Sequence, residues 1–233
     1  MGFGGGSRSV SDEIGYNKGN VEQIREEINT MAKNSAEKIV SEIHDTIVAK
    51  VAELWYSEVA VKYFEEFKAT LKNKETDITE VFQNFNNKMK EAGEAWAATT
   101  EGEAPEMPAI EQVDMTLDVS AIQPTNAEGD RFITDGLEGK VLSMVEDART
   151  NIKTYIDQQT SNADASLAFF GGGQETAINE AARELDEQVD QVLNYLIEGE
   201  NSIVEAVRSR NESYTSTATS NNASFSDSNF GGL

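Results

Sequence analysis

The chain has 233 residues, 42 of them acidic and 19 basic, and a formal net charge of −23. It holds no cysteine, which excludes a disulfide framework and a thiolate zinc site. The strong negative charge argues against nonspecific binding to DNA, RNA or an anionic membrane, because each of these needs a positive field. We therefore expect no nucleic-acid partner.

The N-terminal segment, residues 1–19, is rich in glycine and predicts a flexible arm, because glycine loses much backbone freedom in a helix. It lacks the basic stretch and apolar core of a secretory signal peptide. No apolar run approaches the roughly 20 residues that a membrane span needs. We expect a soluble chain with no membrane span. If it is secreted, it leaves the cytoplasm without a classical signal peptide.

Residues 20–98 predict a first helical hairpin. Apolar residues recur at intervals of three and four over residues 21–54, and again over residues 64–89. Two alternatives stay open within this region. One is a break between residues 73 and 77, where a capping pattern begins. The other is a continuous helix through Trp55 in place of a turn.

Residues 99–131 hold all three prolines and many acids, and predict an acidic, extended linker. Within it, Val113, Met115, Leu117 and Val119 alternate with polar residues, which is typical of a short extended segment. We favour a linker over a strand in a sheet, because no second strand is predicted to pair with it.

Residues 132–210 predict a second helical hairpin. Helical spacing returns from about Phe132 and ends near Phe169, where a run of glycines predicts a turn. Apolar positions resume at Ile178 and continue to Val207 as a single fourth helix. The tail, residues 211–233, contains 13 serine, threonine or asparagine residues and predicts a disordered segment. It is either an export or docking segment or a solubilising end.

The two hairpins share one layout of helix, aromatic turn and helix, which favours an internal duplication. When Trp55 is placed on Phe169, the second helices align without a gap. The matched apolar pairs are Phe64 with Ile178, Leu71 with Leu185, Ile78 with Val192, Phe82 with Leu196 and Met89 with Ile203.

The layout of each half resembles the WXG-motif, ESAT-like family of type VII secretion substrates, which are helical hairpins with a Trp-X-Gly turn. Trp55-Tyr56-Ser57 stands where Trp-X-Gly would be, and Phe64 follows where the family has an aromatic residue. In the second half, Phe169-Phe170-Gly171 keeps the glycine and lacks the tryptophan. The family's Tyr-X-X-X-Asp/Glu export signature is absent, so the resemblance implies another export signal or one supplied by a partner.

The resemblance also implies an all-α fold, because family members are helical hairpins. One hairpin leaves an apolar face exposed, so family members pair into four-helix bundles. We expect two long hairpins packed as an antiparallel four-helix bundle, resembling a fused dimer. The implied function is that of a non-enzymatic, secreted or secretion-associated protein that contacts the secretion ATPase or a co-secreted protein. The candidate turn and partner-contact residues are Trp55, Tyr56, Ser57, Phe64, Phe169, Phe170 and Gly171.

A structural subunit of a phage particle or other large assembly is the alternative function. Gly-rich terminal arms would then lock neighbouring copies together in the virion by self-assembly. We do not expect an enzyme, a cofactor or a metal. The single histidine, His44, has no second histidine with which to build a metal site, and solvated helix faces account for the many carboxylates.

Overall fold

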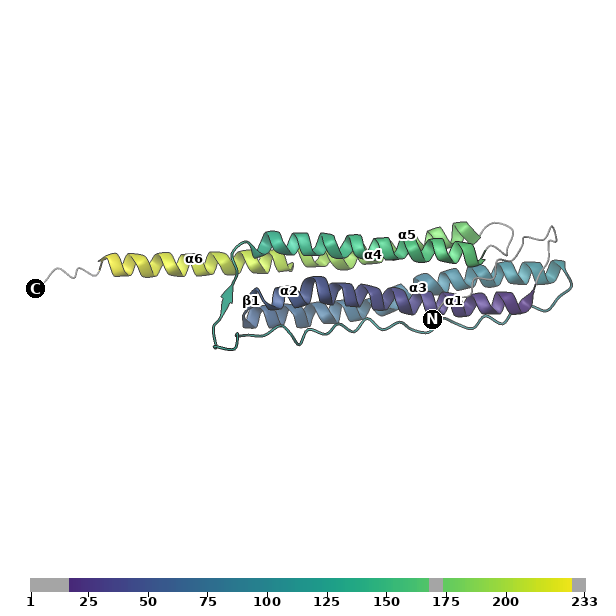
Figure 1. The fold of residues 1–233 in the computed structure, drawn as a ribbon, viewed down its shortest axis with the longest axis horizontal. Helices are drawn as coiled ribbons and strands as arrows, with labels where there is room; N and C mark the ends of the chain where they lie inside the picture. The colour runs from purple at the N-terminus through teal and green to yellow at the C-terminus, as the bar shows by residue number, and fades with distance from the viewer. Residues whose placement is uncertain (1–16, 168–173, 228–233) are drawn as a thin grey trace, which may run out of the picture.

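The computed structural model describes residues 17–167 and 174–227, which are mostly helical (Figure 1), as expected. The one sheet among these residues is a pair of two-residue strands. In chain order the elements are α1 (Lys18–Ile43), the π-helical turn η1 (His44–Val48), α2 (Ala49–Ala52), β1 (Trp55–Tyr56), α3 (Glu58–Thr99), β2 (Phe132–Ile133), α4 (Leu137–Leu167), α5 (Gln174–Ile197) and α6 (Ile203–Asp227).

The long helices lie side by side along one axis (Figure 1). α1 packs against α3 and α4, and α5 packs against the same two helices. Their apolar residues, spaced by three and four, face inward and form one continuous core. Phe64, Phe67 and Phe85 of α3 are among its largest fully buried side chains.

The π-helical turn η1 keeps the apolar face of the first helix directed at this core. Ile39, Ile43, Ile47 and Val51 follow one another at intervals of four and are all buried. In a regular α-helix of 3.6 residues per turn, steps of four would rotate the face steadily away. A π-helical turn holds more residues than an α-helical turn, so it absorbs the excess.

The turn at Trp55 exists, and the alternative of a continuous helix is wrong. Helical backbone ends at Ala52 and begins again at Glu58. The alternative of a break between residues 73 and 77 is also wrong, because α3 runs through them without interruption. Glu75 and Ile78 in this stretch are buried, so packing holds the helix there.

Residues 103–122, which we call the strap, are extended as expected but are more than a linker. The strap runs back along α1 and α3 (Figure 1), and its apolar side chains belong to the core. The alternating residues from Val113 to Val119 are all buried. An extended chain needs no partner strand here, because helix side chains bind its backbone.

The second half departs from the prediction in three places. Phe132 lies in β2 rather than in a helix, and α4 begins only after Gly136, whose φ is +69°. The fourth helix is interrupted at residues 198–202, which separate α5 from α6. The tail was predicted to be disordered from residue 211, yet α6 continues to Asp227.

The helical tail has a physical cause. Nucleation is the costly step of helix formation, and the packed first turns of α6 supply the nucleus from which the polar residues propagate. Ile203, Val204 and Val207 are the buried residues of those turns. Beyond them, α6 projects past the ends of the neighbouring helices (Figure 1). Of the predicted N-terminal arm, residues 1–16 lie outside the described residues, and its last two residues, Lys18 and Gly19, belong to α1, because Asn17 caps that helix.

Candidate functional site: the tip of the first hairpin

The turn between α2 and α3 is closed by Ser57, which caps α3. The Ser57 Oγ accepts a hydrogen bond from the Ala60 backbone N–H at 3.1 Å, and the Ser57 side chain is buried. Its φ of −167° is extended backbone that any residue adopts. Serine therefore serves at this position, where the family has glycine, and its side chain adds a cap that glycine lacks.

The aromatic residues named from the sequence lie in different surroundings. Trp55 and Phe64 have no exposed surface, and within the described part of the chain the Trp55 indole Nε1 has no hydrogen-bond partner. Tyr63 packs edge-on against Phe64, with ring centroids 5.4 Å apart, and burial raises the pKa of its hydroxyl. Tyr56 is only half-buried. On the fold described here, a docking protein therefore reaches Tyr56 but not Trp55 or Phe64.

A residue far along the chain completes the tip. β1 pairs with β2 in antiparallel register, with Tyr56 opposite Phe132 and Trp55 opposite Ile133. The Thr134 N–H extends the pairing by donating to the Leu54 carbonyl at 2.8 Å. The Tyr56 and Phe132 rings lie with centroids 5.1 Å apart, and Phe132 remains 37% exposed. Sequence reasoning missed Phe132 because its two-residue strand is too short to show an alternating pattern.

The turn predicted in the second half is the counterpart of the turn at Trp55. Phe169, Phe170 and Gly171 lie outside the described residues. The aligned residues of α5 and α6 are placed, and each pair named above is buried in both halves.

The strap runs along the helices towards the tip and packs closely against α3 (Figure 1). Near the start of the strap, Pro105 lies against Gly93 of α3. The approach is so close that a Cβ on Gly93 would lie 2.9 Å from the Pro105 Cγ and 3.0 Å from the Val21 Cγ1. Any larger residue at position 93 would push the strap out. The buried side chains of the strap are Pro105, Met107, Ile110, Val113, Met115, Leu117, Val119 and Ile122.

Helix side chains hold the backbone of the strap on both sides. From α1, Arg25 donates to the carbonyls of Pro108 and Ala109, and Asn29 Oδ1 accepts from the Glu111 N–H. From α3, the contacts follow helical spacing. Glu75 Oε1 accepts a hydrogen bond from the Met115 N–H at 2.8 Å, and Thr79 Oγ1 accepts one from the Val113 N–H at 3.1 Å. Gln83 Oε1 accepts from the Ile110 N–H at 2.7 Å, and the Asn86 amide donates to the Pro108 carbonyl at 3.1 Å.

The outer edge of the strap is acidic and ion-paired. The Thr116 hydroxyl and Lys72 hydrogen-bond to Asp114, and together they lower the pKa of its carboxyl to about 2. Lys33 lowers the pKa of Glu111 in the same way, at a distance of 2.6 Å. The Ser120 backbone N–H lowers the pKa of Asp118. The predicted linker is thus fastened by core packing, backbone hydrogen bonds and charge.

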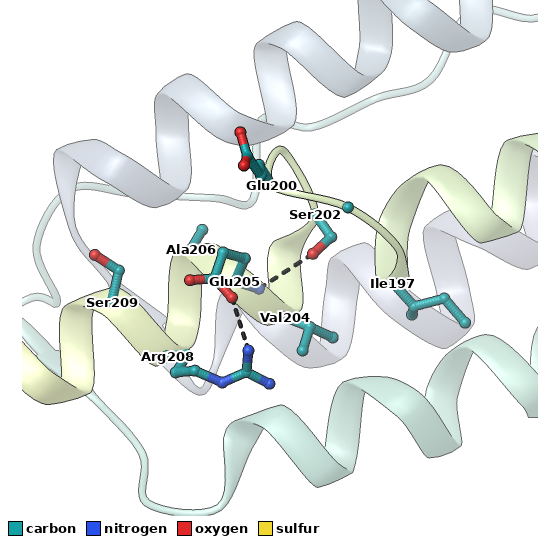
Figure 2. Close-up of a pocket in the computed structure, with 9 residues that line it drawn as sticks. Ile197, Glu200, Ser202, Val204, Glu205, Ala206, Arg208 and Ser209 are labelled. Atoms are coloured by element: carbon teal, nitrogen blue, oxygen red, sulfur yellow. Dashed lines mark hydrogen bonds and ion pairs between the residues drawn. The ribbon is translucent and has the colours of Figure 1, made fainter.

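A surface hollow of about 710 Å³ lies at the break between α5 and α6 (Figure 2). Ser202 caps α6 there by accepting from the Glu205 N–H at 3.2 Å. Arg208 is engaged by Glu205 at 2.7 Å and by Glu138 at 2.6 Å. These two carboxylates balance the positive charge of the Arg208 guanidinium, which leaves no free charge to attract an anion. The hollow is therefore a junction between helices rather than an anion site.

The described residues hold no group of three or more potential metal ligands. His44 lies on the surface with its Nδ1 2.7 Å from Asp45. In residues 17–167 and 174–227, no helix is both long enough and apolar enough to cross a bilayer. Comparisons with family models, with curated proteins and with solved structures find no match.

Proposed function

We propose that this chain is a non-enzymatic helical protein of the WXG-motif kind, exported by type VII secretion, which acts by presenting its surface to a protein partner. The tip of the first hairpin carries the proposal. A tryptophan lies in a helix–turn–helix, a serine two residues later caps the next helix, and Phe64 of that helix is fully buried. Trp55 and Phe64 are the residue types on which the resemblance rests, and Ser57 stands where the family has glycine.

We further propose that the four long helices act as an antiparallel four-helix bundle, equivalent to a fused dimer. The contacts of α1 and α5 with both α3 and α4 support this arrangement. The strap adds support from the other side, because it covers apolar groups between α1 and α3 that a lone hairpin would expose. A chain built in this way needs no second hairpin from outside, and we expect it to be a monomer.

The partner in this proposal is the secretion ATPase or a co-secreted protein. The alternative partner is a second copy of the chain in a virion or other large assembly. The projection of α6 beyond the other helices supports this alternative, because a projecting helix can reach a neighbouring copy (Figure 1). The two readings differ in particle size, because a fused dimer sediments as a small species and an assembly subunit sediments with its particle.

Density-gradient fractionation of a cell-free culture supernatant separates these possibilities. The chain is followed in producing cells with the secretion ATPase and in matched cells that lack it. Recovery as a light species only when the ATPase is present supports the proposal. Sedimentation with particles, independent of the ATPase, transfers the function to the assembly subunit. Retention in the cells under both conditions refutes both readings.

A further inference from the structure

Exposed apolar side chains gather at the tip. Among the described residues, the large apolar side chains that are exposed are Val59, Phe132 and Leu142. Two of these flank the turn: Val59 lies in the first turn of α3, and Phe132 packs against Tyr56 with the two rings tilted by 51°. The β1–β2 pairing and the Thr134 hydrogen bond to Leu54 hold Phe132 in place. An aromatic group fixed in this way can bind without paying the entropy of becoming ordered.

The surroundings of this patch are negatively charged. The turn and the segment around β2 carry five exposed carboxylates and one guanidinium, that of Arg131. One helical turn beyond Val59, the Lys62 ammonium lies 3.7 Å from Glu66, which partly neutralises it. Arg131 lies 3.8 Å from Glu58 and is partly neutralised by it. The carboxylates belong to Glu53, Glu58, Glu128, Asp130 and Asp135.

We propose that Tyr56, Val59 and Phe132, with these five carboxylates, form a docking site for a basic segment of a partner protein. The segment would place an apolar side chain on the aromatic pair and its Lys or Arg side chains on the acidic rim. Arg would also gain by lying over the aromatic rings. A second copy of this chain does not fit, because two acidic rims would repel. The proposal rests on the proposed function and names the chemistry of its partner.

Binding of a synthetic amphipathic Leu/Lys helix tests the surface directly. The peptide is titrated into the full chain and followed by fluorescence anisotropy and by amide NMR shifts. We expect the shifts to centre on Tyr56 and Phe132. Phe132→Ser should weaken binding about tenfold, as loss of a central interface anchor does. Leu142→Ser, which removes an equally exposed apolar group from α4, is the matched control and should leave binding unchanged.

A second pair of variants separates local from total charge. Glu53→Lys with Glu128→Lys reverses two charges at the tip, whereas Glu91→Lys with Glu175→Lys reverses two exposed charges at the opposite end. Only the first pair should weaken binding. Equal losses from both charge-reversal pairs would show attraction to net charge alone and overturn the proposal. Equal losses from Phe132→Ser and Leu142→Ser would show nonspecific apolar contact and overturn it as well.

Photo-crosslinking in producing cells tests the partner. A photoreactive phenylalanine is placed at position 132, and at position 142 as the control. A crosslink specific to position 132, in a segment of net positive charge, supports the proposal. A crosslink to a second copy or to an acidic segment, or no excess over position 142, overturns it. Export of the chain is scored separately. If the chain is exported in an ATPase-dependent way but position 132 gives no specific crosslink, this docking site alone is refuted. If position 132 crosslinks to a basic segment but the chain stays in the cells, the proposed function alone is refuted.

Discussion

The strap and the distal half of α6, residues 211–227, are both segments that the sequence marks as lacking ordinary secondary structure, and they differ in how they are held. The strap has no helix, yet its apolar residues are buried and its backbone is bonded to two helices. Distal α6 is regular helix, yet its described side chains from Thr215 to Asn221 are all exposed. Regular backbone and tertiary anchoring are therefore independent in this chain, and stability should follow anchoring.

The largest expected effect comes from the buried side of the strap. Leu117→Ala should lower the free energy of unfolding by about 3 kcal/mol, because Leu117 is fully buried and the lost contacts leave a cavity. Urea denaturation measures the change. Leu142→Ala, at a leucine that is 43% exposed, should cost less than about 0.5 kcal/mol. Similar values for the two variants would mean that the strap is not part of the core.

The backbone contacts of the strap should give a smaller effect. Glu75→Ala removes the acceptor for the Met115 N–H and leaves a buried donor unpaired, which costs about 2 kcal/mol. Glu75→Gln keeps an acceptor oxygen at the same place and should retain most of the stability. Denaturation of both variants beside the unaltered chain separates the hydrogen bond from the carboxylate charge.

Acidification should weaken the strap and spare distal α6. The pKa values of Glu111, Asp114 and Asp118 are lower in the fold than in the unfolded chain, so their ionised forms stabilise the folded state. This contribution is present above the ordinary pKa of about 4 and is lost as the pH falls towards about 2. The chain should therefore lose more stability over that interval than the Glu111→Gln, Asp114→Asn, Asp118→Asn variant. An equal loss in both proteins would contradict the assignment. Because these groups are exposed, the difference should be small.

Removal of distal α6 should have the smallest effect. A chain ending at Arg210 loses the contact in which the Arg210 guanidinium lies 4.6 Å from the centre of the Tyr214 ring. We expect the free energy of unfolding to fall by less than about 1 kcal/mol, while circular dichroism shows the loss of helix. A larger loss of stability would show that distal α6 is anchored after all.

The elements that could be predicted are those whose apolar residues repeat with the period of a helix. The face that begins at Val21 and the one that begins at Phe64 both appeared in the sequence, as did the turn at Trp55. Pairing across the chain left no such signal. Phe132 could not be linked to Tyr56, since a two-residue strand has no period and the partner lies far away in sequence.

The strap shows a different limit. Its alternation indicates an extended segment outside any sheet, as the structure has it, but the alternation does not reveal that the segment packs into the core. Helix side chains, rather than a partner strand, bond to its backbone, and Asn29, Thr79 or Gln83 would be read from sequence as ordinary surface polar residues. The break at residues 198–202 gives a weak signal in the sequence, because Ile203 keeps the apolar spacing. Gly199 is the residue that indicates it, and its φ of +85° is typical of a helix C-terminus.

The π-helical turn η1 also bears on how this protein tolerates changes in length. Deleting one residue from a regular helix rotates everything beyond it by about 100° and turns its apolar face outward. η1 already contains a surplus residue, so a deletion between His44 and Val48 would restore a plain α-helix and leave α2 and Trp55 facing the core. We therefore expect the first helix to tolerate the loss of one residue here and still fold.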